Sequence, residues 1–97
     1  IIFDEIDTGV SGEISNKIAA IMQKMSANMQ VIAITHLPQI AAKGSNHYKV
    51  YKDEVNGITT TNLKELSATE RLTEIAEMLS GKDISDSALT HAKELLN

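Results

Sequence analysis

The sequence Ile1-Ile2-Phe3-Asp4-Glu5-Ile6-Asp7 carries a short apolar run directly into three carboxylates. The apolar residues predict a strand that is buried on both faces of a sheet. The acids then emerge at the carboxyl end of that strand, where open α/β sheets bind ligands. In many phosphoryl-transfer ATPases the first such acid holds Mg²⁺ and the next positions the attacking water. The alternative interpretation of these residues is a strand that ends in a solvated acidic turn.

A helix is predicted after this acidic turn, starting at Ser11 or Gly12 and ending near Asn28. Its apolar residues recur at steps of three and four and are Ile14, Ile18, Ile21, Met22 and Met25. The helix crosses to a second apolar run at residues 31–35, which predicts a second strand. Such strand–helix–strand units are almost always right-handed and make their strands parallel.

The second strand ends in Thr35-His36, so it also carries polar side chains to its carboxyl end. If the two strands are parallel neighbours, Asp4, Glu5 and His36 line the same edge of the sheet. The imidazole of His36 is then placed to donate a hydrogen bond to a terminal phosphate. The alternative is that His36 caps the short helix that begins at Pro38, or that it lies on the surface.

The next segment predicts a β-hairpin. Residues 47–52 alternate with a period of two, which is typical of a half-buried strand. Asn56-Gly57 is a strong hairpin signal, and residues 58–66 form a Thr-rich return strand. We expect this hairpin at the edge of the sheet, with His47 in a structural or exposed position.

Two helices are predicted at the end of the chain. Ser67 and Glu70 have the spacing of a capping box, and Gly81 is a good terminator. The second helix follows residues 84–86, and His91 is expected on its surface. The residues expected to face inward are Leu72, Ile75, Ala76, Leu79, Ala88, Leu89, Ala92, Leu95 and Leu96. Arg71 is expected on the solvated face, or paired with Glu74 or with a partner chain.

Composition narrows the possible functions. The chain has 97 residues, enough for one domain with a modest core, and 42% of them are hydrophobic. Nine Lys and Arg residues against thirteen acids, a net charge of −4, argue against a DNA-binding surface in this segment. The sequence contains no cysteine, which suits a cytoplasmic protein, and neither a signal peptide nor a membrane-spanning run is recognisable.

Two blocks of the sequence, residues 3–12 and 34–42, resemble the C-terminal part of the RecN family of bacterial DNA-repair ATPases. That family is related to the SMC proteins and has an ABC-type ATPase head, and the resemblance continues through residues 71–79 and 88–92. It implies that Asp4 is the Walker B aspartate that holds Mg²⁺ and that Glu5 is the catalytic glutamate. It also implies that Asp7 begins the D-loop at the ATP and dimer interface, and that His36 is the switch histidine, which contacts the γ-phosphate of ATP.

The fold implied by this resemblance is α/β, a partial P-loop NTPase with parallel strands, a crossover helix, an edge hairpin and two C-terminal helices. Residues 1–97 would then be the C-terminal lobe of an ABC-type ATPase head, because neither a Walker A phosphate loop nor a signature motif occurs in the sequence. We therefore expect a fragment of a longer protein that is inactive alone, with little stability of its own or a tendency to self-associate.

The resemblance also implies partners and ligands. ATP and Mg²⁺ would be the cofactors, and the missing N-terminal half of the head would complete the site. Two heads would form a homodimer around ATP, whereas DNA would be bound only through the intact protein, which would be cytoplasmic and nucleoid-associated. No membrane partner is expected.

Two other interpretations stay open. In one, the residues Asp4, Glu5, Asp7 and His36 form the complete site of a metal-dependent hydrolase. In the other, the chain is a non-catalytic interaction module that docks through its Met-bearing helix or its terminal helices. The retention of both Asp4 and Glu5 disfavours the second interpretation, because a docking module has no need of that pair.

Overall fold

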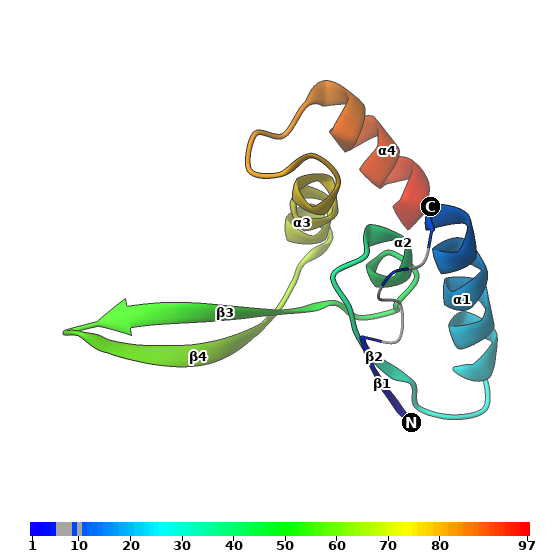
Figure 1. Cartoon of the computed structure of the whole chain (residues 1–97), viewed down its shortest axis with the longest axis horizontal. Coiled ribbons are helices and arrows are strands. Elements are labelled where there is room, and N and C mark those ends of the chain that lie inside the picture. Colours follow the sequence, from blue (N-terminus) through cyan, green and yellow to red (C-terminus); the bar gives the residue numbers. More distant parts are fainter. Residues whose placement is uncertain (6–8, 10) are drawn as a thin grey trace.

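The computed structural model describes residues 1–5, 9 and 11–97, and in these residues it has four strands and four helices. In chain order they are β1 (Ile2–Asp4), α1 (Gly12–Met25), β2 (Ile32–Ile34), α2 (Pro38–Ala41), β3 (Tyr48–Val55), β4 (Ile58–Glu65), α3 (Ala68–Ser80) and α4 (Asp86–Leu96). Figure 1 shows α3 and α4 on one side of α2, and the β1–β2 pair with α1 on the other. The chain is therefore α/β, as predicted.

Strands β1 and β2 are parallel, and α1 connects them, which confirms the predicted unit. Phe3 lies opposite Ala33 and Asp4 lies opposite Ile34 in the register of the pair. The predicted start of α1 is also confirmed, because the Ser11 side chain accepts a hydrogen bond from the backbone N–H of Ile14. The helix ends at Met25, a few residues before the predicted end.

A small core lies between these strands and the helices α1 and α2. Its buried members are Ala19, Met22 and Ile40, with Phe3, Ile18 and Val31 packed against them. The prediction that the strands are buried on both faces was wrong for this chain, since Ile2, Ile32 and Ile34 are 65%, 45% and 51% exposed. The reason is that successive side chains alternate between faces. The helices cover Phe3 but leave its register partner Ala33 exposed, and no element within residues 1–5, 9 and 11–97 buries the face that carries the isoleucines.

Helix α1 buries only part of its predicted apolar stripe, since Met22 is in the core and Ile18 packs against it. Its fully buried residues are Ser15 and Ala19, and Met22 is nearly buried. Ile14 and Ile21 of the predicted stripe are 48% and 60% exposed. The small residues face inward because they allow α1 to approach its neighbours closely, which leaves the two isoleucines on the outside.

The antiparallel hairpin of β3 and β4 forms with the predicted turn. Tyr48 lies opposite Glu65 and Val55 lies opposite Ile58, with Asn56 and Gly57 between the strands. Both turn residues have positive φ, 55° and 76°, as the type of turn that joins two twisted strands requires. The local sequence therefore determined this turn correctly.

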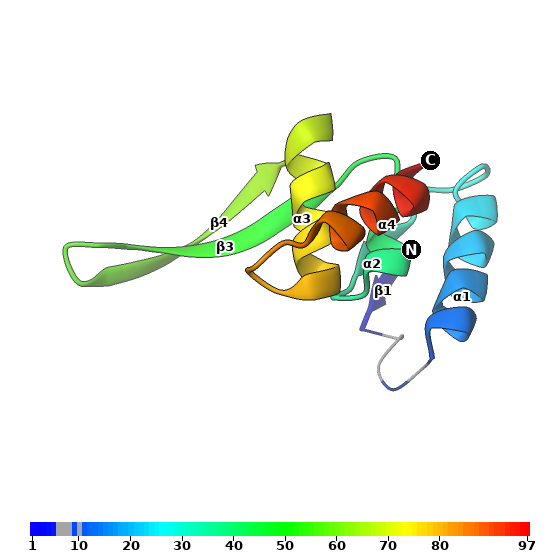
Figure 2. The ribbon, with the colours of Figure 1, turned by 90° about the horizontal axis from the view of Figure 1, so that it is seen from above.

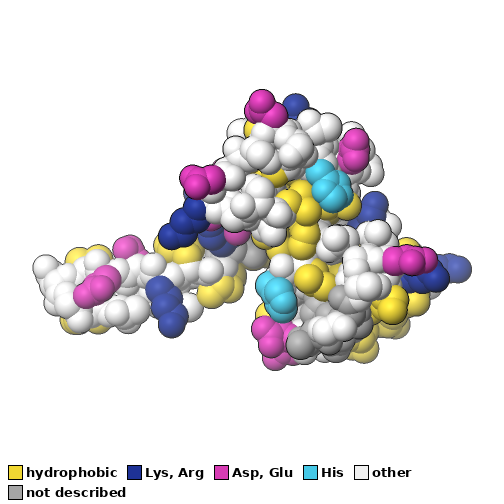
Figure 3. Space-filling view, turned by 45° about the horizontal axis from the view of Figure 1, so that its top comes forward, with side chains coloured by type: hydrophobic (Ala, Val, Ile, Leu, Met, Phe, Trp, Pro, Cys, Tyr) yellow, Lys and Arg dark blue, Asp and Glu magenta, His cyan; other side chains and the backbone are white. Residues whose placement is uncertain are grey.

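The predicted position of the hairpin was wrong. Strands β3 and β4 form a two-stranded sheet of their own and are not paired with β1 or β2. The hairpin projects from the body of the molecule in both Figure 1 and Figure 2. It is also largely exposed rather than half-buried, with Val50, Val55, Ile58 and Leu63 at 60–66% exposure. Figure 3 shows the hydrophobic side chains along its surface. The period-two alternation thus predicted the strand correctly, but it did not predict where in the fold the strand packs.

Helices α3 and α4 follow their predictions closely. The capping box is present, because the Ser67 side chain accepts from the N–H of Glu70 and the Glu70 side chain accepts from the N–H of Ser67. Gly81 ends α3 with φ of 81°. The two helices pack together over a second core, whose buried members are Ala42, Ile75, Ala76, Ala88 and Ala92. The predicted leucines pack around this core, so the inward faces are confirmed.

Candidate functional site

Asp4 and Glu5 lie where β1 ends, next to the end of β2. Asp4 is paired with Ile34, and the backbone N–H of Glu5 donates to the carbonyl oxygen of Ile34 at 2.9 Å. Glu5 has φ of 51°, which is uncommon for a residue other than glycine and turns the chain sharply after the strand. Both acids are exposed. The carboxyl ends of the two strands therefore bring these acids beside the residues that follow β2.

His36 lies in the turn between β2 and α2 and is exposed. The hydroxyl of Thr35 accepts a hydrogen bond from the N–H of Leu37 at 3.0 Å, which holds this turn. Leu37, rather than His36, is the N-cap residue of α2. The imidazole is thus not used as a helix cap, and it lies at the same end of the strand pair as Asp4 and Glu5.

The carboxylates fit Mg²⁺ better than they fit a self-contained metal site. Mg²⁺ is usually bound through one or two carboxylates together with substrate phosphates, and Asp4 and Glu5 are two adjacent exposed carboxylates. Within residues 1–5, 9 and 11–97, no three His, Cys, Asp or Glu side chains gather where they would hold a metal ion. The fourth residue of the hydrolase interpretation, Asp7, lies outside the described residues. That interpretation therefore gains no support from the described part of the chain.

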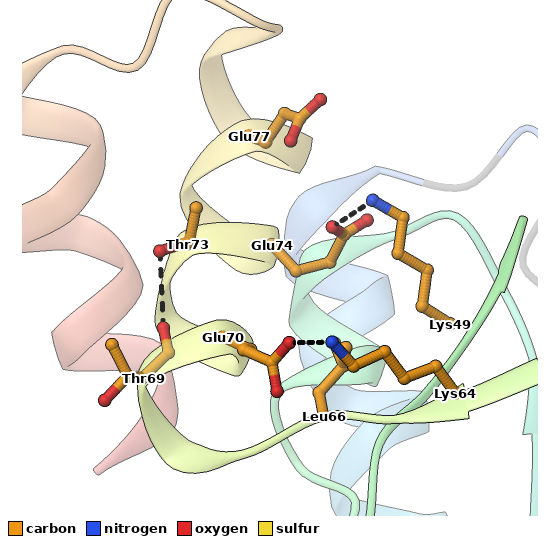
Figure 4. A pocket seen from close by; sticks show the side chains of 8 residues that line it. All are labelled: Lys49, Lys64, Leu66, Thr69, Glu70, Thr73, Glu74 and Glu77. Carbon is orange, nitrogen blue, oxygen red and sulfur yellow. Dashed lines mark hydrogen bonds and ion pairs between the residues drawn. The ribbon is translucent and has the colours of Figure 1, made fainter.

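A hollow between the hairpin and α3 lies away from these acids. Figure 4 shows its lining, which is Lys49, Lys64, Leu66, Thr69, Glu70, Thr73, Glu74 and Glu77. The two lysines are paired with acids of α3, since Lys49 Nζ lies 2.7 Å from Glu74 Oε2 and Lys64 contacts Glu70. Lys64 and the capping interaction with Ser67 lower the pKa of Glu70 to about 2. The ion pairs that line this hollow thus connect the hairpin to α3.

Arg71 has partners that the sequence did not predict. Its Nη2 group donates to the backbone carbonyl oxygens of Ala41, at 2.9 Å, and Ala42, at 3.0 Å, and it also donates to the carbonyl of Gly44. Both the solvated-face interpretation and the pairing with Glu74 were therefore wrong. No local pattern could have revealed these contacts, because the partners are 27 to 30 residues away in sequence.

His47 is the second polar residue whose surroundings only the structure reveals. Burial, followed by the charge of Arg71, lowers the pKa of the imidazole below its usual value. Its Nδ1 atom is buried and has no hydrogen-bond partner among the residues that are described. The predicted structural position of His47 is confirmed, whereas His91 is exposed on α4 as expected.

Across the described chain, no helix has both the length and the apolar character that a membrane span requires.

Comparison with known proteins finds several relatives that share one name. No family model matches the chain. The DNA repair protein RecN of Bacillus subtilis is 48% identical over 96 residues, covering 99% of this chain and 17% of the relative. RecN of Rickettsia conorii is 46% identical over 97 residues, covering 100% of this chain and 18% of the relative. RecN of Deinococcus radiodurans is 44% identical over 96 residues, covering 99% and 17%. The chain thus spans about a sixth of the length of these curated relatives, given coverage of 17–18%.

Among solved structures, the chain is similar to one from a study of ATP-driven dimerisation and DNA-stimulated activation of SMC ATPases. The TM-score is 0.64 at 19% sequence identity, and the match covers 82% of this chain and 47% of the other. At this identity the match shows a similar fold only. In sequence, the chain is similar over its whole length to the C-terminal part of the RecN family of bacterial DNA repair proteins.

Proposed function

We propose that residues 1–97 form the C-terminal lobe of an ABC-type ATPase head in a RecN-like DNA repair protein, and that the reaction is hydrolysis of ATP. The observation that carries this proposal is the parallel β1–β2 pair, which ends with Asp4 and Glu5 on one strand and leads into His36 on the other. This is the edge of an α/β sheet at which ligands bind. The similarity to RecN and to an SMC ATPase head supports the same conclusion.

Each of these side chains has a distinct role in the proposed reaction. Asp4 would hold Mg²⁺, which would supply positive charge to neutralise the negative charge on the phosphates. Glu5 orients the attacking water and accepts its proton as the water oxygen bonds to the γ-phosphorus and the bond to the β-phosphate oxygen breaks. ADP and phosphate are the products. His36 donates a hydrogen bond to the γ-phosphate, so that it distinguishes ATP from ADP.

Completion of this site requires surfaces that lie outside this sequence. The sequence contains no phosphate loop of the G-x-x-x-x-G-K-[ST] type and no Leu-Ser-Gly-Gly signature. We infer that the N-terminal half of the head supplies the phosphate loop and covers the exposed isoleucines of β1 and β2. In a homodimer of heads around ATP, Asp7 would begin the D-loop that reaches across the interface. DNA would contact other parts of the protein, because this segment has a net charge of −4.

The first test is DNA-stimulated ATP hydrolysis by the full-length protein that carries this segment, with and without Glu5→Gln. This change removes the carboxylate while it preserves the side-chain shape, so turnover should fall by about 10²- to 10⁴-fold. ATP binding should remain and ATP-bound dimers should accumulate. Glu54→Gln, on the exposed hairpin strand β3, is the matched control and should leave turnover unchanged. Unchanged turnover in Glu5→Gln would remove the catalytic assignment and favour the interaction module.

The second test uses the 97-residue chain alone. We expect no ATP turnover from it, because it lacks the phosphate loop. Turnover by the purified chain, free of contaminating ATPase, would contradict the proposed lobe. Titration with Mg²⁺ in the absence of nucleotide separates the hydrolase alternative, since tight stoichiometric binding would favour a self-contained metal site.

A further inference from the structure

Helix α2 lies between the two cores of the molecule and contacts both of them. Ile40 is buried with residues of α1, β1 and the start of the β2 segment, whereas Ala42, directly after the helix, is buried against α3 and α4. Figure 1 and Figure 2 both show α2 between these two groups of elements. His36 lies two residues before Pro38, the first residue of α2. The turn that carries His36 is therefore anchored by β2 on one side and by α2 on the other, so a shift of α2 would alter it.

A helix as short as α2 has little stability of its own. It has four residues, Pro38–Ala41, and its N-cap residue Leu37 makes no side-chain capping hydrogen bond. Isolated short helices are marginal in water because their nucleus is costly to form. The carbonyl groups at a helix C-terminus lack partners within the helix and carry partial negative charge. The stability of α2 therefore depends on the burial of Pro38 and Ile40 and on the groups that contact its C-terminal end.

Arg71 provides that contact from another helix. Its Nη2 group converges on the carbonyls of Ala41, Ala42 and Gly44, so a positive charge meets the negative end of α2. The side chain is partly buried, and its Nε atom has no partner among the described residues. Hydrogen bonds that involve a charged group are roughly twice as strong as neutral ones. Arg71 is therefore the main polar link between α3 and α2.

Helix α3, which carries Arg71, is itself well anchored. Its N-terminus is closed by the capping box of Ser67 and Glu70, and Ile75 and Ala76 anchor it fully buried against α4. Figure 4 shows Lys49 and Lys64 of the hairpin paired with Glu74 and Glu70 on the side of the helix that faces the hairpin. The backbone of Arg71 is consequently held from both sides, so its side chain can transmit the position of α3 to α2.

We propose that Arg71 is a positioning residue that acts on His36 by holding the C-terminal end of α2 to α3. The proposal rests on the proposed role of His36 at the γ-phosphate. Loss of the Arg71 contact frees the end of α2, so the turn at residues 35–38 samples several orientations and His36 is correctly placed for only part of the time. A series of contacts thus leads from the hairpin through α3 and α2 to His36, the residue proposed to contact the γ-phosphate.

Hydrogen exchange tests the local part of this proposal without any enzymatic assay. Arg71→Met removes the donor, so amide exchange in residues 40–44 should accelerate about tenfold or more, while exchange in β3 and β4 should be unchanged. Lys82→Met, which removes a positive charge just beyond α3, is the matched control and should alter neither region. Equal acceleration in α2 and in the hairpin would mean general destabilisation and would overturn the proposal.

ATP turnover by the full-length protein tests the functional part through a double-mutant cycle of Arg71→Met and His36→Ala. We expect Arg71→Met to lower kcat on the order of tenfold when His36 is present, and to have no further effect in the His36→Ala background. Equal losses in both backgrounds would overturn only the positioning role. If His36→Ala alone leaves turnover unchanged, the proposed role of His36 would be overturned instead. If Arg71→Met does not fold, Arg71→Lys keeps the charge on a shorter stem and should give a smaller loss that also depends on His36.

Discussion

Helices α3 and α4 bury their apolar residues against each other, whereas strands β1 and β2 leave most of theirs exposed. Ile75, Ala76 and Ala92 are completely buried, but Ile2 and Ile32 are 65% and 45% exposed. Both regions have an apolar content that is typical of a core. They differ in whether the complementary surface belongs to the described chain. Two amphipathic helices supply that surface for each other, whereas a pair of parallel strands needs a covering element on each face.

The difference should be largest in the response to a core truncation. Ile75→Ala leaves a cavity in a fully buried position, so we expect a loss of about 2–5 kcal/mol in the free energy of unfolding. Ile32→Ala, the matched change on the exposed strand face, should cost much less, since nearly half of that residue is already exposed to water. Urea unfolding of the 97-residue chain measures both. Equal losses would show that the strand face is covered in solution, and Ile75→Val is a milder variant if Ile75→Ala does not fold.

Helix capping gives a smaller effect on the same comparison. Ser67→Ala breaks the capping box of α3, which should cost about 1 kcal/mol of stability. Ser11→Ala removes the corresponding cap of α1, whose hydrogen bond to the N–H of Ile14 is longer at 3.4 Å, so its cost should be lower. Thermal unfolding followed by circular dichroism compares the two variants. A larger loss from Ser11→Ala would contradict the idea that α3 is the better-defined helix.

The smallest expected effect is on pH dependence where the hairpin meets α3. Burial and the charge of Arg71, together with Lys49, lower the pKa of His47, and the opposing charge of Glu74 does not reverse this. The unfolded chain therefore takes up the proton first as the pH falls through about 6.5, the ordinary pKa of histidine. Stability should decrease from that pH downward, until the pH passes the lowered pKa of the folded state.

His47→Gln removes this titration, so its melting temperature should change less than that of the original chain between pH 7.5 and 5.5. The carboxyl of Glu70 does not interfere in this range, because its pKa is about 2 in the fold. The stability that Glu70 contributes is complete above the ordinary pKa of a glutamate and disappears as the pH falls toward 2. An unchanged slope in His47→Gln would show that another group causes the loss.

Sequence reasoning succeeded wherever the decisive residues were near one another in the chain. Ser67 and Glu70 marked the start of α3, and Asn56-Gly57 marked the hairpin turn, because a cap or a tight turn is made by residues within three positions. The polar ends of β1 and β2 were recognised for the same reason. The roles of Asp4, Glu5 and His36 remain proposals, and Asp7 lies outside the described residues.

The sequence by itself thus determined the order of the helices and strands, the parallel unit that brings Asp4 and His36 to one edge, and the apolar faces of α3 and α4. Only the tertiary structure decided that the hairpin forms a separate sheet and that Arg71 holds the end of α2. The physical reason is that periodicity specifies which side of an element is apolar, but not which distant surface covers it. Arg71 and its carbonyl partners are 27 to 30 residues apart, so their contact exists only once the two cores have packed around α2.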